Sequence, residues 1–266
     1  MGKYSQVFKI SWDSSLVYRF NFVMWRLRTI ISFLAIYFFW VAVFKHNNQV
    51  FDYTQTSLLT YIIIARFVGT LVFSNLSDSA GQEIAYGQLS NYLLKPISYL
   101  KYWLSRDLAD KVLNLIFFFA ELVLIILILR PPLIFPSNIS AWLLFSGTTI
   151  LAIIMFFYFN FLVNTFSFWY PERGGWPLRF LAWMLLEFLT GGMFPLDILP
   201  QNIYAWFKWL PGGYLTYFPT GFYLGKFDAF ESVRIILTTL AWIAIFYWLT
   251  KFAWKKGLKI YGAYGR

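Results

Sequence analysis

Long apolar runs alternate with short polar interruptions along the chain, and this alternation predicts helices that cross a membrane. A membrane-crossing helix needs about 20 mostly apolar residues. Helices are expected because lipid offers no partner to an unpaired backbone group, and the runs are too long for barrel strands. The predicted spans cover about 25–44, 53–73, 109–129, 141–163, 176–194 and 230–250. We therefore expect an all-α polytopic membrane protein with six transmembrane helices in one domain, residues 25–266.

The first 24 residues carry large apolar side chains at a spacing of four, with basic residues between them. The apolar positions are Tyr4, Phe8, Trp12, Leu16 and Phe20. This pattern is typical of a helix that lies in the membrane interface with its aromatic side towards the lipid. We predict a cytoplasmic interfacial amphipathic helix over residues 1–24.

The stretch 195–227 is apolar and aromatic, but prolines interrupt it too often for a membrane span. Short helices that dip into the outer leaflet fit this composition, so we predict an outer re-entrant segment. Its candidate gate residues are Phe194, Pro195, Pro200, Trp209, Pro211, Tyr214 and Pro219. The alternative is an interfacial aromatic belt, which membrane proteins commonly carry.

Composition supports a membrane protein and excludes several other classes. The chain is 59% hydrophobic and only 13% charged, whereas soluble proteins carry about 25% charged residues. The net charge of +10 does not indicate nucleic-acid binding, because the basic residues lie at the ends of apolar runs. The absence of cysteine excludes disulfides and thiolate metal sites. The single histidine, His46, has no clustered partners, so a metal or catalytic role is not expected.

The distribution of Lys and Arg predicts the orientation. With a cytoplasmic N-terminus, sixteen basic residues flank the spans on the inner side and four on the outer side, leaving out Arg66 and Arg234. Cytoplasmic loops carry such an excess. We expect a multi-pass protein of the cell membrane with both termini in the cytoplasm.

The polar loop 75–108 between the second and third spans contains "EIAYGQLSNYLLKPIS". Its apolar residues recur at spacings of three and four: Tyr86, Leu89, Leu93, Ile97 and Leu100. This spacing predicts an amphipathic helix, interrupted or redirected at Pro96. Such a helix either lies on the inner membrane surface as a connector or docks into a groove on a cytoplasmic partner.

Two motifs in the chain resemble those of one transporter family. Glu83, Gly87, Leu89, the pair Leu93-Leu94 and Pro96 match the E-x3-G-x-L-x3-LL-x-P pattern of ATP-binding-cassette (ABC) exporter permeases of the type-2 class. The strings "GGMFPLDILP" and "LPGGYLTYFPTGFYLG" resemble a second signature, that of the compact six-span permeases often labelled multidrug or viologen exporters. The resemblance covers the whole chain. Many relatives have Thr-Leu-Glu after the glycine, whereas this chain has Gln88-Leu89-Ser90.

The resemblance implies a permease subunit without its own ATPase. It implies pairing with a second permease chain, identical or paralogous, and with two copies of a cytoplasmic ABC ATPase that binds ATP and Mg²⁺. The implied ATPase-coupling residues are Glu83, Tyr86, Gly87, Leu89, Leu93 and Pro96. A phosphate-binding loop needs G-x-x-x-x-G-K-[ST], and the nearest string, "GFYLGKF", fails in spacing and in its last residue. We therefore expect no bound cofactor, no enzyme activity in this chain alone, and no nucleic-acid partner.

Charged residues within apolar runs are costly and often functional. Arg66, Glu121 and Glu187 are such residues, so they are candidates for the translocation path or a subunit interface. The alternative is a buried Arg–Glu pair, or side chains that reach a helix end.

Two other functions stay open from the residues alone. One is an intramembrane enzyme that modifies lipids, for which the string "DLAD" over 107–110 is the only approach to clustered catalytic groups. The other is an ion- or proton-driven carrier, although the halves show no repeat of the kind that carriers often have. The scarce charge and the aromatic outer segment favour a hydrophobic or amphipathic substrate.

Overall fold

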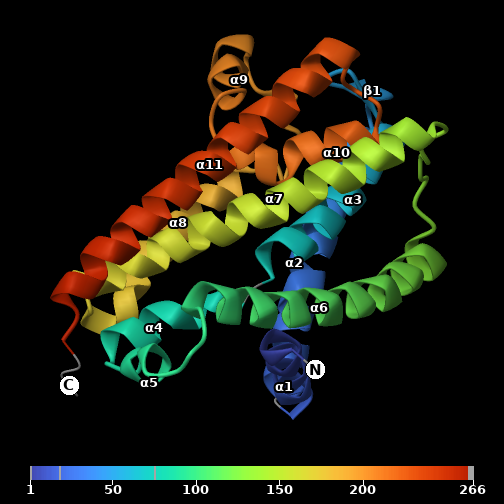
Figure 1. Cartoon of the computed structure of the whole chain (residues 1–266). Helices are drawn as coiled ribbons and strands as arrows, with labels where there is room; N and C mark the ends of the chain where they lie inside the picture. Colours follow the sequence, from blue (N-terminus) through green and yellow to red (C-terminus); the bar gives the residue numbers. More distant parts are fainter. Residues whose placement is uncertain (1, 18, 75, 263–266) are drawn as a thin grey trace.

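The structure, a computed structural model, describes residues 2–17, 19–74 and 76–262 and is almost entirely helical (Figure 1). The long helices are α1 (Lys3–Val17), α2 (Arg19–Phe44), α3 (Gln55–Phe73), α6 (Tyr99–Leu129), α7 (Ile139–Thr165), α8 (Trp176–Leu189) and α11 (Ala229–Ile260). The shorter helices are η1 (Ser77–Ser79), α4 (Ala80–Ala85), α5 (Ser90–Leu93), η2 (Phe166–Phe168), η3 (Glu172–Gly175), η4 (Leu196–Ile198), α9 (Gln201–Phe207), η5 (Gly212–Leu215) and α10 (Tyr217–Tyr223). Strands β1 (Gln49–Val50) and β2 (Tyr53–Thr54) form one antiparallel hairpin.

Five helical stretches in the described part are long and apolar enough to cross a membrane. They are Val23–Phe44, Gln55–Phe73, Tyr99–Leu129, Ile139–Phe168 and Ala229–Ile260. The prediction of an all-α polytopic membrane protein is therefore confirmed, and the count of six spans stays a prediction.

The fifth predicted span, 176–194, is shorter in the structure. Helix α8 has 14 residues, about 21 Å at 1.5 Å per residue, whereas the hydrocarbon core is about 30 Å thick. The helix ends because Gly191 has φ +75, a left-handed conformation that breaks the helical path. A Cβ at Gly191 would lie 2.9 Å from Cβ of Tyr217, so the chain passes close to α10 there.

Two other span boundaries differ from the prediction. The second span begins at Gln55 rather than 53, because Tyr53 belongs to the hairpin and the side chain of Thr54 caps the helix by accepting from Ser57 N. The third helix begins at Tyr99 rather than near 109, so about ten residues of the predicted loop 75–108 belong to α6. The charges at 101–111 obscured this start in the sequence.

Helices α7 and α11 lie side by side along the length of the molecule (Figure 1). Thr250 Oγ1 donates to Tyr158 O at 3.0 Å across this pair. Helix α10 is buried against α7 and α3, so the segment 195–227 packs back against these helices, while its place on the outer side stays a prediction. The segment α4–α5 lies at one end of the α7–α11 pair, near the C-terminus, and the β-hairpin lies at the other end (Figure 1).

Helix α1 packs against α6. Ser98 N donates to the hydroxyl of Tyr4 at 3.1 Å, and Lys3 Nζ donates to Pro96 O at 3.3 Å. The predicted interfacial helix 1–24 is thus a shorter helix that ends at Val17, and its half-buried Tyr4, Phe8 and Trp12 are partly covered by the protein. The side chains of Leu16, Arg19 and Arg173, and all of Arg266, which entered the predictions above, lie outside the described residues.

Candidate coupling site

The chain between α3 and α6 folds into two short helices rather than one amphipathic helix. Helix α4 ends at Ala85, and Gly87 follows with φ +76, a left-handed turn that favours glycine. Helix α5 spans only Ser90–Leu93 and ends before Pro96. The predicted apolar stripe is therefore wrong: of its five residues, Leu89 and no other is fully buried, because the chain turns at Gly87 and again after α5 instead of continuing as one helix.

Asp107 of α6 anchors the beginning of this segment. Its carboxylate accepts hydrogen bonds from Leu76 N and Ser77 N, each at 2.8 Å, and from Ser77 Oγ at 2.7 Å. Asn160 of α7 donates to Ser77 Oγ at 3.0 Å. Asp107 is only 1% exposed, so these donors replace the water that a buried carboxylate would otherwise need.

Asn164 of α7 holds the next turn. Its Oδ1 accepts from Gly81 N and from Arg179 Nη1, both at 3.1 Å. Arg179 of α8 also donates to Asp78 O. A Cβ at position 81 would lie 2.7 Å from Asn164 Oδ1, so only glycine allows this close approach. We call Ser77, Asp78, Asp107, Asn160, Asn164 and Arg179 the polar cluster.

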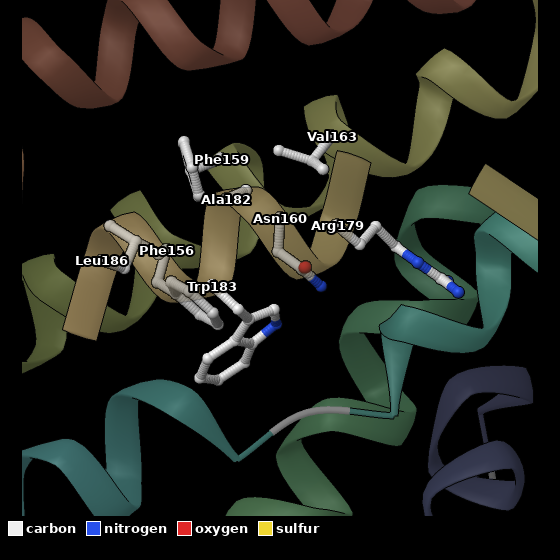
Figure 2. A pocket seen from close by; sticks show the side chains of 8 residues that line it. All are labelled: Phe156, Phe159, Asn160, Val163, Arg179, Ala182, Trp183 and Leu186. Carbon is white, nitrogen blue, oxygen red and sulfur yellow. The ribbon is translucent and has the colours of Figure 1, made fainter. Parts of the chain in front are cut away.

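Figure 2 shows how α7 and α8 present part of the polar cluster. Asn160 and Arg179 lie at one end of the crevice between these helices, and the guanidinium of Arg179 points towards the chain around α4. Phe156, Trp183 and Leu186 fill the other end. Burial raises the pKa of Asp78, while the charge of Arg179 and the side chains of Asn160 and Trp183 lower it. The cluster therefore links the segment to α6, α7 and α8.

Lys111 of α6 is fixed to the end of α3. Its ammonium group donates to the carbonyl oxygens of Leu71 at 2.7 Å, Val72 at 3.1 Å and Ser74 at 2.6 Å. The last carbonyls of a helix lack intrahelical partners, and a cation there also matches the helix dipole. Together with Asp107, Lys111 therefore fixes both sides of the turn between α3 and α4.

Glu83 faces into the segment. Its carboxylate accepts from Tyr99 Oη at 2.6 Å and from Tyr92 Oη at 3.1 Å. Burial raises its pKa from 4.5, while these hydrogen bonds and the charge of Arg106 lower it. Leu89 is 0% exposed and belongs to a small core with Ile84, Trp103 and Phe161.

The opposite side of the segment is open. Leu94 is 88% exposed, and Tyr86 and Leu93 are about half exposed. Gln88, Asn91, Tyr92, Leu94 and Lys95 line a hollow on this surface. Pro96 is exposed beside it. We call Tyr86, Leu93, Leu94, Lys95 and Pro96 the exposed face.

The chain matches the family described as ABC-2 family transporter protein over residues 30–265. It belongs to this family. The resemblance found in the sequence is thereby confirmed, and the protein is an integral membrane component of ABC transport, a role that in general goes with an ABC ATPase partner. No curated protein matches the chain.

The structure divides the predicted ATPase-coupling residues of this permease into two groups. Glu83, Gly87 and Leu89 support the segment from within, while Tyr86, Leu93 and Pro96 belong to the exposed face.

Sequence reasoning missed Asp107 except as part of "DLAD", and it missed Asn160 and Asn164 altogether. A signal existed, because two amides four residues apart interrupt the cleanest apolar run and must share one helix face.

The predicted buried Arg–Glu pair exists, but its arginine is Arg26 rather than Arg66. Arg26 Nε donates to Glu121 Oε1 at 2.6 Å. Arg26 is 8% exposed, whereas the sequence placed it among the cytoplasmic flanking charges. Glu187 is exposed on α8 and takes part in no ion pair within the described residues.

A second polar group lies at the hairpin end and includes residues of the predicted outer segment 195–227. Tyr53 Oη donates to Asp197 Oδ1 at 2.8 Å, and Lys226 Nζ donates to Asp197 Oδ2 at 2.7 Å. The hydroxyls of Tyr204 and Tyr217 lie 2.9 Å apart, and Tyr61 Oη donates to Gly191 O at 2.6 Å. These residues, Tyr53, Tyr61, Asp197, Tyr204, Tyr217 and Lys226, form the tyrosine cluster.

Around the tyrosine cluster, the predicted gate residues have different environments. Pro195, Tyr214 and Pro219 are buried, and Tyr214 donates to Lys208 O. Phe194 and Pro211 are half-buried. Pro200 and Trp209 are exposed, so these two are accessible to lipid, solvent or a partner.

Proposed function

We propose that this chain is the permease subunit of an ABC exporter, and that a separate cytoplasmic ATPase drives it by binding the exposed face. Two permease chains, identical or paralogous, would form the path for a hydrophobic or amphipathic substrate. Two ATPase subunits would supply ATP and Mg²⁺ binding. Both termini and the α4–α5 segment would then lie in the cytoplasm of a cell-membrane protein.

One observation carries this proposal: the α4–α5 segment is apolar and exposed on one side and hydrogen-bonded to three long helices on the other. Leu94 is 88% exposed, and Tyr86 and Leu93 of the same segment are about half exposed, an apolar patch of the kind that marks an interaction site. Behind it, the polar cluster connects the segment to α6, α7 and α8. A force applied to the exposed face would therefore move these helices as a unit.

The mechanism needs two states of the membrane part that the ATPase can bias. Closure of the ATPase subunits on ATP would push the α4–α5 segment, and the polar cluster would transfer this movement to α6, α7 and α8. Because the cluster bonds are short and buried, the segment would move with the helices rather than fold against them.

The experiment is purification of the chain together with its ATPase. We expect a stable complex, and we expect Leu94→Arg to weaken the ATPase affinity by roughly tenfold or more, as for an exposed apolar anchor at an interface. The folded yield of this variant should equal that of the wild type. The matched control is Phe51→Arg, another exposed apolar residue (60% exposed), in the hairpin at the other end.

A different result would contradict the proposal. If the isolated chain transports cargo after ATP is removed, the carrier alternative gains support. If the isolated chain modifies a lipid, the alternative of an intramembrane enzyme gains support. If Leu94→Arg and Phe51→Arg bind the ATPase equally well, the exposed face is not the docking surface.

A further inference from the structure

Two arginines from different helices lie near one carboxylate. Arg26 of α2 pairs with Glu121 of α6 at 2.6 Å. Arg66 of α3 lies beside this part of α6, because the ring of the next residue, Phe67, packs on those of Phe118 and Phe119 at 5.3 and 6.1 Å, and it is within electrostatic range of both groups. Within the described residues Arg66 makes no ion pair, so its charge lacks a direct counterion.

Hydrogen-bond donors exceed acceptors at this place. Arg26 Nη1 donates to Asn114 Oδ1 at 3.1 Å, but its Nη2 is buried and has no hydrogen-bond partner among the residues that the structure describes. The guanidinium of Arg66 makes no hydrogen bond within residues 2–17, 19–74 and 76–262, and it is partly exposed. A buried donor without an acceptor destabilises the fold, which indicates a site that a ligand completes.

The neighbouring acceptors are occupied. The amide nitrogen of Asn114 donates to Asp110 O, so its oxygen is the group left for Arg26. Asp110 makes no ion pair with Arg26 within the described residues, and its neighbour Lys111 is fixed to the end of α3. Asp110 therefore does not supply the missing acceptor.

We propose that Arg66 and Nη2 of Arg26 bind the anionic headgroup of an amphiphile, a phosphate monoester or a carboxylate. Planar guanidinium groups bind such oxygen pairs in a bidentate way. The surroundings suit an acyl chain, because the ring of Phe67 packs on those of Phe118 and Phe119 at 5.3 and 6.1 Å. We call Arg26, Arg66, Asn114 and Glu121 the arginine site.

The test uses the purified full-length chain in a neutral detergent, titrated with dioleoyl phosphatidate and, as the uncharged control, dioleoylglycerol. We expect phosphatidate to bind and to raise the melting temperature, and dioleoylglycerol to do neither. Arg66→Gln should weaken phosphatidate binding by roughly tenfold, the effect of one charge-assisted hydrogen bond. Arg28→Gln is the matched control, since Arg28 is exposed on α2 and contacts the Trp25 ring.

A variant that binds phosphatidate more tightly distinguishes an effect at the binding site from a folding defect. Glu121→Gln removes the carboxylate that competes for the two arginines, so this variant should bind phosphatidate several-fold more tightly than the wild type. Poor folding would weaken binding instead. Arg66→Lys, which keeps the charge but not the planar fork, should fall between Arg66→Gln and the wild type.

Three outcomes would overturn the proposal: equal binding by Arg66→Gln and wild type, weaker binding by Glu121→Gln that melts at the wild-type temperature, or equal binding of phosphatidate and dioleoylglycerol. A fourth concerns Glu187, the exposed carboxylate of α8. If Glu187→Gln dissociates a dimer of this chain and Arg66→Gln does the same, a second copy supplies the anion.

A second experiment distinguishes a transported substrate from a resident lipid as the source of the headgroup. The chain with its ATPase is placed in vesicles containing fluorescent phosphatidate. ATP-dependent movement of the label between leaflets identifies a transported substrate, and its absence identifies a resident lipid; the site stands in both cases. Because binding to the isolated chain needs no ATPase, failure of the arginine site is distinguishable from failure of the proposed function.

Discussion

The polar cluster and the tyrosine cluster hold opposite ends of the α7–α11 pair, and they do so with different chemistry (Figure 1). In the polar cluster, carboxylate and amide side chains bind backbone groups of a turn. In the tyrosine cluster, hydroxyls meet a single partly buried ion pair, and ring packing fills the remaining space. The first arrangement fixes several backbone groups of one turn, whereas the second joins mainly side chains, with Tyr61 Oη on Gly191 O as a backbone contact. Under the proposed function, the first end would receive force from the ATPase and the second would open.

The largest effect is expected for Asp107→Ala. The substitution leaves Leu76 N, Ser77 N and Ser77 Oγ without their acceptor in a buried site. We expect a loss of about 3–5 kcal/mol in the free energy of unfolding, as for a broken buried charged network. Thermal unfolding in detergent measures it. Asp110→Asn, on the same helix, should cost clearly less, and equal costs would contradict the anchoring role of Asp107.

The next effect separates the two sides of the α4–α5 segment. Leu89→Ala should lower the free energy of unfolding by about 2–5 kcal/mol because it empties a fully buried position. Leu94→Ala should change it by less than about 0.5 kcal/mol because that side chain is exposed. The comparison of their melting temperatures is the measurement. A larger loss at Leu94 would contradict the assignment of Leu89 to the buried side of the segment and of Leu94 to its exposed side.

The tyrosine cluster should be less sensitive than the polar cluster. Lys226→Met leaves Asp197 with Tyr53 as its hydrogen-bond donor in a site that retains some solvent access. We expect a loss of about 1–2 kcal/mol, the range for a hydrogen bond to a charged group. Tyr53→Phe should cost a similar amount. If either variant unfolds the chain as readily as Asp107→Ala, the contrast between the two ends is wrong.

The smallest effect is a pH dependence from Glu83. Burial raises its folded-state pKa above 4.5, so the folded state binds this proton more tightly than the unfolded state. The contribution is fully present below pH 4.5 and is lost as pH rises through the folded pKa. Stability should therefore fall slightly over this window. Glu83→Gln should remove that slope in melting curves recorded at several pH values, and an unchanged slope would assign it to another group.

Much of the architecture could be predicted from the sequence because it depends on local composition. The run 141–163 lies within α7 and the run 230–250 lies within α11, since nothing in these stretches competes with a membrane helix. The start of α6 was missed because charges at its first turns imitate a loop, although tertiary contacts at Trp103 and Asp107 stabilise the helix there.

The site was harder to predict because its contacts are not local. Periodicity placed Leu89 and Leu93 on one face of a long helix, but α5 is a single short turn, in which Leu89 is buried and Leu93 is half exposed. In the sequence Glu83 is a charge in a polar loop, whereas in the structure Tyr92 and Tyr99 donate hydrogen bonds to its carboxylate. The role of Asn164 depends on Gly81, which is far away in sequence, and Arg26 finds its partner Glu121 on another helix.

The most direct test of the central claim, that the exposed face receives the ATPase while the opposite side is attached to the helices, is site-specific cross-linking. The chain contains no cysteine, so a single cysteine at position 94 can carry a photoactivatable cross-linker in the assembled complex. We predict a cross-link from Leu94→Cys to the ATPase and none from Phe51→Cys at the hairpin end. Cross-linking from position 51 but not from position 94 would contradict the account.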